Sequence, residues 1–115
     1  MLILCYPRCT TCKRALQWLQ DQNIAYIERD IAKENPSKEE LVRWHELSGL
    51  DWKRFFNTSG LKYKELKLKD KLPLMSDEEK ADLLATDGML VKRPLVVGED
   101  FVLVGFREAE WERLK

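Results

Sequence analysis

Hydrophobic positions in the first third of the chain follow three patterns. A continuous apolar run over Leu2–Tyr6 is typical of a strand buried on both faces. A helical stripe follows from Thr10 to about Gln22, and a loosely alternating segment over Ala25–Ile31 indicates a second strand. A strand, a helix and a strand in this order predict a βαβ unit, in which the two strands are parallel.

The middle of the chain is predicted to be helical and highly charged. Ser37–Glu40 has the spacing of a capping box ahead of an apolar stripe, and Gly49 is placed to end that helix. Asp51 is expected to cap a short aromatic helix. A second capping box at Ser76–Glu79 begins a helix that we expect to end at Gly88.

The last part of the chain returns to strands. Two short apolar runs, Leu95–Val97 and Phe101–Val104, flank a turn containing glycine and predict a β-hairpin. Arg107–Leu114 is expected to close the chain as a short helix. This element order predicts an α/β protein with a thioredoxin-like fold, formed by a single domain over 1–115 with an inserted helical lobe at about 33–90.

Composition narrows the function classes. Twenty basic and 20 acidic side chains cancel, and a pI near 6.6 argues against a nucleic-acid binder that works by bulk charge. No apolar stretch approaches the roughly 20 residues of a membrane span. Three cysteines without a recognisable export signal predict a reducing, cytoplasmic setting. The charged middle helices are interpreted as solvated faces.

The Cys-Thr-Thr-Cys segment from Cys9 to Cys12 carries the candidate chemistry. It follows a strand and begins a helix, where free backbone N–H groups and the helix dipole favour a thiolate. Cys9 is expected to be exposed and to act as the attacking thiol. Cys12 lies on the apolar stripe and is expected to be more buried and to act as the resolving thiol. Arg8 and Lys13 add positive charge nearby.

Two other interpretations of the cysteines stay open. The pair could be inert, or it could form a zinc site with Cys5 and His45, provided that Cys5 left its strand. We expect Cys5 to pack in the core as a small hydrophobic residue and His45 to lie on a solvated helix face. No metal is therefore predicted.

Arg93-Pro94, directly before a predicted strand, is the second candidate feature. Proline has no N–H to donate to a ladder and marks a strand entrance. In a thioredoxin-like fold this proline is typically cis and packs against the active cysteine, so Arg93 would point to the same site; the alternative is a surface arginine before a trans-proline. Arg107 either reaches the pocket or pairs with nearby glutamates. The candidate substrate-binding residues are Arg8, Thr10, Thr11, Lys13, Pro94 and Arg107, and the candidate catalytic residues are Cys9, Cys12 and Arg93.

Three segments, residues 6–13, 92–97 and 104–106, together resemble the arsenate reductase and Spx family over essentially the whole chain. The resemblance implies a thioredoxin-like fold with a helical insert, a nucleophilic cysteine at Cys9 and an arginine before a cis-proline at Arg93. Glutathione-coupled arsenate reductases bind their oxyanion with three arginines. Here only Arg93 matches cleanly, since the position near Asn57 lacks the expected arginine and Arg107 is one residue later than the family pattern after Gly105.

Cys12 is similar to the second cysteine of Spx-type proteins, whose disulfide is a switch and which bind the C-terminal domain of the RNA polymerase α subunit. Gly49 falls near the glycine of that contact. The sequence therefore predicts a small thiol–disulfide reductase with no bound cofactor, reduced by glutathione or thioredoxin, and acting on a disulfide or oxyanion substrate. The alternative is an Spx-like redox-switched regulator without turnover. Neither direct nucleic-acid binding nor membrane binding is expected.

Overall fold

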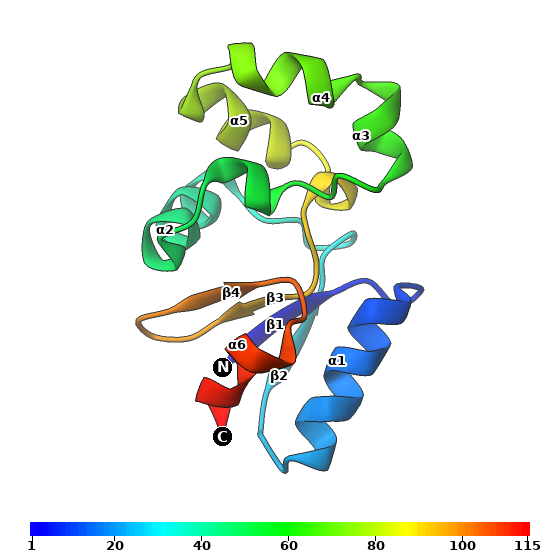
Figure 1. Ribbon diagram of the computed structural model, residues 1–115, viewed down its shortest axis with the longest axis vertical. Coiled ribbons are helices and arrows are strands. Elements are labelled where there is room, and N and C mark those ends of the chain that lie inside the picture. The colour runs from blue at the N-terminus through cyan, green and yellow to red at the C-terminus, as the bar shows by residue number, and fades with distance from the viewer.

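A central four-stranded sheet organises the protein, as seen in a computed structural model that describes all 115 residues (Figure 1). The strand order is β2-β1-β3-β4. β1 (Leu2–Cys5) pairs in parallel with β2 (Ile27–Asp30) and antiparallel with β3 (Leu95–Val97), which pairs antiparallel with β4 (Val102–Val104). The predicted βαβ unit and β-hairpin are both present, and the arrangement is that of a thioredoxin-like α/β fold.

Two helices, α1 (Thr10–Asp21) and α6 (Glu108–Trp111), cover one face of the sheet (Figure 1). Side chains alternate between the faces of a strand, so Ile3 and Cys5 of β1 both point to this layer. They form a buried cluster with the inner side of α1. The other fully or nearly buried members of the cluster are Cys12, Ala15, Leu19, Val96, Leu103 and Trp111.

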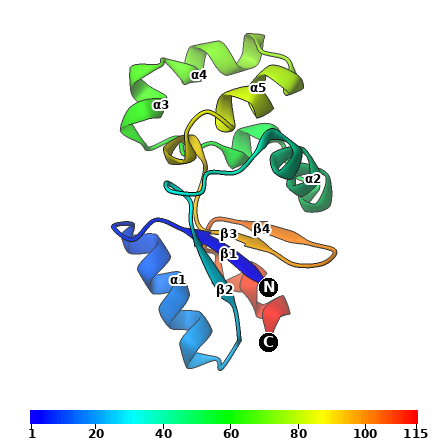
Figure 2. The same ribbon diagram turned by 180° about the vertical axis from the view of Figure 1, so that it is seen from behind.

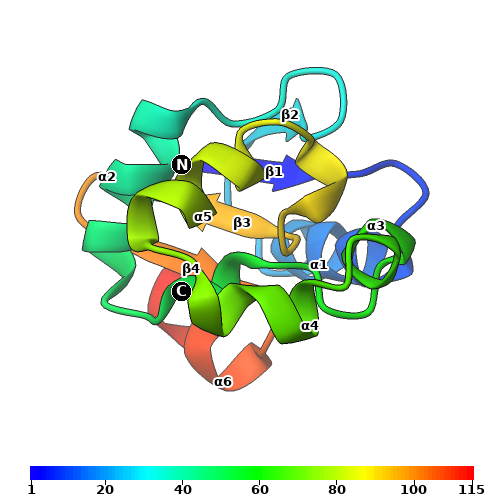
Figure 3. The same ribbon diagram turned by 90° about the horizontal axis from the view of Figure 1, so that it is seen from above.

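A helical lobe covers the opposite face of the sheet (Figures 2 and 3). It contains α2 (Lys38–Ser48), α3 (Leu61–Glu65), α4 (Leu68–Lys71) and α5 (Asp77–Leu84). Leu4 of β1 packs into its core together with side chains of β3, β4 and the lobe. None of the helices combines the length and apolar character needed to cross a bilayer.

The predicted capping boxes begin α2 and α5. The Ser37 hydroxyl accepts a hydrogen bond from the Glu40 N–H, and the Glu40 carboxylate accepts one from the Ser37 N–H; the Ser76–Glu79 pair does the same. α2 ends as expected at Gly49, whose φ of +68° lies in the left-handed region.

The expected role of Gly88 is wrong, because α5 already ends at Leu84 and Gly88 begins a short 3-10 turn. A Cβ at Gly88 would lie 1.8 Å from the Ile31 carbonyl oxygen. Glycine is needed here for a close approach between the lobe and the segment after β2, and not to end a helix.

Other boundaries differ for local reasons. β4 begins at Val102 and not at Phe101. The Phe101 ring lies so close to Gly98 that a Cβ added at Gly98 would be 2.1 Å from a ring carbon. The sequence predicted no element over residues 61–75, where α3 and α4 lie; Lys67, with a φ of +54°, separates them and interrupts the helical period. The predicted terminal helix is α6 followed by a 3-10 turn at Glu112–Leu114.

Candidate functional site

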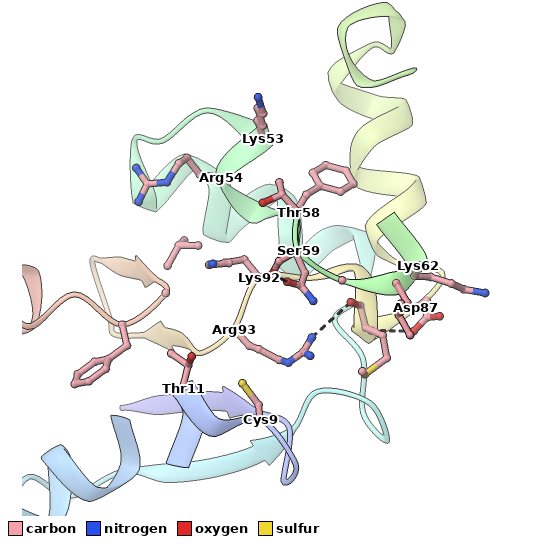
Figure 4. Close-up of a pocket in the computed structure, with 18 of the residues that line it drawn as sticks. Cys9, Thr11, Lys53, Arg54, Thr58, Ser59, Lys62, Asp87, Lys92 and Arg93 are labelled. Carbon is pink, nitrogen blue, oxygen red and sulfur yellow. Dashed lines mark hydrogen bonds between the residues drawn. The ribbon is translucent and has the colours of Figure 1, made fainter. Parts of the chain in front are cut away.

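A cleft of about 1080 Å³ opens between the beginning of α1, the segment before β3 and the helical lobe (Figure 4). Cys9 and Thr11 line it from α1, and Arg93 lines it from the entrance to β3. In Figure 4 the Cys9 sulfur points from the end of the β1–α1 loop into the cleft, on the side where the Arg93 side chain extends. Cys9 and Arg93, the cysteine and the arginine that the sequence singled out, therefore line one cavity.

The chain after β1 turns sharply to place Cys9 at the N-cap of α1. The Cys9 N–H donates to the Tyr6 carbonyl at 2.9 Å, and Cys9 itself has an extended backbone conformation. Its Sγ accepts a hydrogen bond from the Cys12 N–H at 3.4 Å, which satisfies one of the free donors of the first helical turn. Cys12 is 1% exposed, as the sequence predicted, whereas Cys9 is half-buried and not fully exposed; all three cysteines are free thiols.

Donors around Cys12 favour its thiolate. The Cys5 thiol, the Tyr6 N–H, the Cys9 thiol and the positive charge of Arg93 together lower the pKa of Cys12 to about 6, against the opposing effect of burial. Interaction with Cys12 and burial both raise the pKa of Cys5. Cys5 is buried in the core as predicted, and it shares one buried cluster with Cys12, a neighbourhood that no pattern in the sequence indicated.

Arg93 has few partners of its own. The Arg93–Pro94 peptide bond is cis, and Pro94 is buried behind the cleft wall. The Arg93 Nη1 donates to the Met89 carbonyl at 3.5 Å, and the guanidinium carbon lies 5.4 Å from the centroid of the Tyr6 ring. Its Nε is buried and has no hydrogen-bond partner. The protein therefore satisfies this guanidinium only in part, and because Arg93 lines the cleft its charge can serve an anionic group there.

Positive charge predominates around the cleft. Its walls carry six cationic side chains and three acidic ones. The cations are Lys53, Arg54, Lys62, Lys92, Arg93 and Arg107, and the acids are Asp51, Glu65 and Asp87. Lys53, Arg54 and Lys62 come from the helical lobe, and Figure 4 shows them above Cys9 together with Thr58 and Ser59.

The sequence analysis missed most of these cations. It interpreted the charged middle as solvated faces, although residues 53–71 hold seven basic side chains against two acidic ones. That local excess was the available signal. Lys92 was quoted only as part of a motif, and nothing in the sequence showed that it would line the same cleft as Cys9.

The other predicted site residues are divided. Thr11 and Arg107 line the cleft. Arg107 is also the N-cap residue of α6, and its guanidinium is 3.9 Å from the Glu110 carboxylate. This side chain therefore both reaches the pocket and pairs with a glutamate. Arg8, Thr10 and Lys13 are exposed and lie outside the cleft lining. The charge that acts on Cys12 comes from Arg93.

His45 does not lie on a solvated helix face, so that expectation is wrong. Its ring stacks on Trp52, with 4.1 Å between centroids, because the short helix after Asp51 folds back along α2. No group of three or more His, Cys, Asp or Glu side chains is arranged to hold a metal ion.

Two solved structures share this fold over almost the whole chain. The crystal structure of an ArsC-family related protein from Bacteroides fragilis is 60% identical, with a TM-score of 0.98, and the match covers 99% of this chain and 96% of that one. A possible arsenate reductase from Streptococcus mutans UA159 is 48% identical, with a TM-score of 0.86, over 92% of this chain and 90% of that one.

Sequence relatives include both unassigned and regulatory proteins. The uncharacterized protein YusI of Bacillus subtilis (strain 168) is 53% identical over 107 residues, which are 93% of this chain and 91% of YusI. The global transcriptional regulator Spx of Staphylococcus saprophyticus is 29% identical over 108 residues, which are 93% of this chain and 80% of Spx. A model of the ArsC family matches residues 4–114, and the chain therefore belongs to the ArsC family.

Proposed function

We propose that this ArsC-family protein is a thiol–disulfide reductase in which Cys9 attacks and Cys12 resolves. One observation carries the proposal: Cys9 opens into a cationic cleft while its sulfur is hydrogen-bonded to the N–H of a buried second cysteine, three residues along the same helix. An inert pair would need neither the cleft nor the difference in burial between the two sulfurs.

The reaction takes two exchanges. The Cys9 thiolate attacks one sulfur of a substrate disulfide, R–S–S–R′; a Cys9–S–S–R bond forms, and R′S⁻ leaves and takes up a proton. The Cys12 thiolate then attacks Cys9 Sγ, which forms the Cys9–Cys12 disulfide and releases RS⁻. Two electrons have passed from the protein to the substrate. A cellular dithiol such as thioredoxin, or two molecules of glutathione, would reduce the protein again.

The cleft favours an anionic substrate. Its cations outnumber its acids by six to three, and the Arg93 Nε lacks a partner. Its volume of about 1080 Å³ is that of a site for a sizeable organic molecule and not for a small oxyanion alone. A glutathione adduct or an acidic disulfide fits this volume and charge better than arsenate alone. No bound cofactor is needed, and we place the protein in the cytoplasm.

Turnover of a glutathione mixed disulfide tests the proposal. Wild type is expected to reduce it, Cys9→Ser is expected to be inactive, and Cys12→Ser is expected to stop as a covalent Cys9 adduct that intact-mass spectrometry detects. Protein alkylated before the assay serves as the blank. Equal turnover by Cys9→Ser and wild type would show that another group does the chemistry.

A second function, redox-dependent binding to the RNA polymerase α subunit, is favoured by a different observation. Gly49 is exposed, its φ is +68°, and no atom lies within 4 Å of the position of a Cβ there, so this corner is open to a partner. The relationship to Spx adds to this. A pulldown with the α C-terminal domain, using reduced and oxidised protein, tests this binding function. Gly49→Asn is the control variant, because asparagine tolerates the same backbone conformation. No retention in either state would exclude this function.

A further inference from the structure

Three sulfurs meet where β1 ends and α1 begins. Cys5 is the last residue of β1 and, like Ile3, points to the face that α1 covers. The buried side of α1 begins with Cys12, followed by Ala15 and Leu19. Cys5 and Cys12 are each 1% exposed and belong to one buried cluster, so the strand and the helix bring the two thiols into the same buried layer.

A buried sulfur that has to carry negative charge needs hydrogen-bond donors, because water is excluded. Besides the Tyr6 backbone N–H, the surroundings of Cys12 offer few donors. Every other fully or nearly buried member of the cluster except Trp111 has an apolar side chain, and the Trp111 indole N–H already donates to the Gly105 carbonyl at 3.1 Å. The Cys9 sulfur is in turn consumed when it forms the mixed disulfide. Cys5 is then the one thiol that remains beside Cys12.

The two buried thiols also divide the proton unequally. The interaction with Cys5 is the largest influence that lowers the pKa of Cys12, to about 6, while the same interaction and burial raise the pKa of Cys5. Cys5 therefore keeps its proton and is a donor at neutral pH. Because it is so rarely a thiolate, it is unsuited to attack a disulfide itself.

We propose that Cys5 is a positioning residue for the resolving step: its S–H donates a hydrogen bond to Cys12 Sγ and holds that buried sulfur as the nucleophile that releases the substrate from Cys9. The inference rests on the proposed reductase function. It also has a redox consequence. The Cys5 S–H stabilises the reduced protein, in which Cys12 is a thiolate. It loses this charged acceptor once Cys9 and Cys12 form a disulfide. The hydrogen bond therefore makes the disulfide more oxidising.

The test follows the titration of Cys12 in variants in which Cys9, and then also Cys5, is replaced. In Cys9→Ser, and in the same variant with Cys5→Ala or Cys5→Ser added, the ultraviolet absorbance of the thiolate is followed against pH. The midpoint for Cys9→Ser is expected near 6. Adding Cys5→Ala is expected to raise it by about one to two pH units, the size for one hydrogen bond to a charged group. Adding Cys5→Ser keeps a donor and is expected to keep the midpoint low.

A matched control separates hydrogen bonding from packing. Ile3→Val removes one methyl group from the same face of the same strand and is expected to leave the midpoint unchanged. The proposal is overturned if Cys5→Ala leaves the midpoint where it was, if Cys5→Ser shifts it as far as Cys5→Ala does, or if Ile3→Val shifts it equally. These titrations need no turnover, so failure of the reductase function would be seen separately, as inactivity of the wild type.

The redox equilibrium gives a second readout with both cysteines of the pair present. Cys5→Ala is expected to shift the Cys9–Cys12 equilibrium with glutathione at neutral pH about tenfold towards the disulfide, which is about 30 mV towards a more reducing potential. Cys5→Ser is expected to stay near wild type. A shift of Cys5→Ala in the oxidising direction would contradict the assignment.

Discussion

The Cys12 N–H donates a hydrogen bond to Cys9 Sγ over 3.4 Å, so the Cys9 sulfur caps the helix that carries Cys12. The separation of the pair is thereby fixed by the first turn of α1 and not by a flexible loop. In the proposed reaction, Cys12 would therefore be held near Cys9 when Cys9 forms a mixed disulfide.

The resolving step is expected to depend on pH with a midpoint near 6. The pKa of Cys12 is lowered to about 6, so its thiolate persists well below the pKa of an ordinary cysteine and is lost only as the pH falls through that value. Below the midpoint the rate is expected to fall about tenfold per pH unit. The Cys9–glutathione adduct is prepared at low pH, the pH is raised rapidly, and acid-quenched samples are analysed by mass spectrometry. A midpoint at the value of an ordinary thiol would contradict the assignment.

Arg93→Gln is expected to weaken the use of anionic substrates. Its Nε is the buried donor without a partner, and a hydrogen bond between charged groups is worth about 1.5–3 kcal/mol, so kcat/KM should fall by about ten- to a hundredfold. The loss should be much smaller for an uncharged disulfide. Arg113→Gln is the matched control, since Arg113 lies over the Phe101 ring and not in the cleft. An equal loss with both substrates would show that Arg93 does not bind the anion.

Much of the fold could be predicted because its signals are local. The capping boxes at Ser37 and Ser76, the glycine stop at Gly49 and the strand-to-helix turn at Cys9 each depend on a few neighbouring residues. The burial of Cys12 followed from helical spacing alone.

The rest depends on contacts between distant segments. The need for glycine at position 88 comes from the Ile31 carbonyl, and the environment of His45 comes from its stacking on Trp52. The cleft combines residues from α1, the lobe and the segment around Arg93, so no single window of sequence contains its charge. The pairing of Cys5 with Cys12 likewise needs the packing of a strand against a helix.

Gly88→Ala is expected to destabilise the protein by about 2–3 kcal/mol, because the new methyl group would overlap the Ile31 carbonyl, which the backbone cannot easily move. Gly60→Ala is the control. There the nearest atom, at 2.6 Å, is the end of the flexible Asn57 side chain, so the cost should stay below about 1 kcal/mol. Urea unfolding midpoints measure both. Equal stability of the two variants would argue against the close approach at Gly88.

Ser37→Ala is expected to cost about 1 kcal/mol of stability through loss of the cap of α2, with little effect on reductase turnover because α2 does not line the cleft. Ser59→Ala removes a serine hydroxyl from an exposed turn, where it makes one contact of 3.3 Å to Asn57, and should change stability much less. Thermal unfolding compares the two. A Ser37→Ala protein as stable as wild type would show that the capping box contributes nothing.

Phe106 lines the cleft, and its ring meets Trp111 edge-on at 4.8 Å between centroids. Trp111 in turn meets Trp18 at 5.8 Å. An occupant that moves Phe106 therefore alters the surroundings of two indoles. Their emission should act as an intrinsic optical probe, with which candidate ligands can be screened without any dye or label.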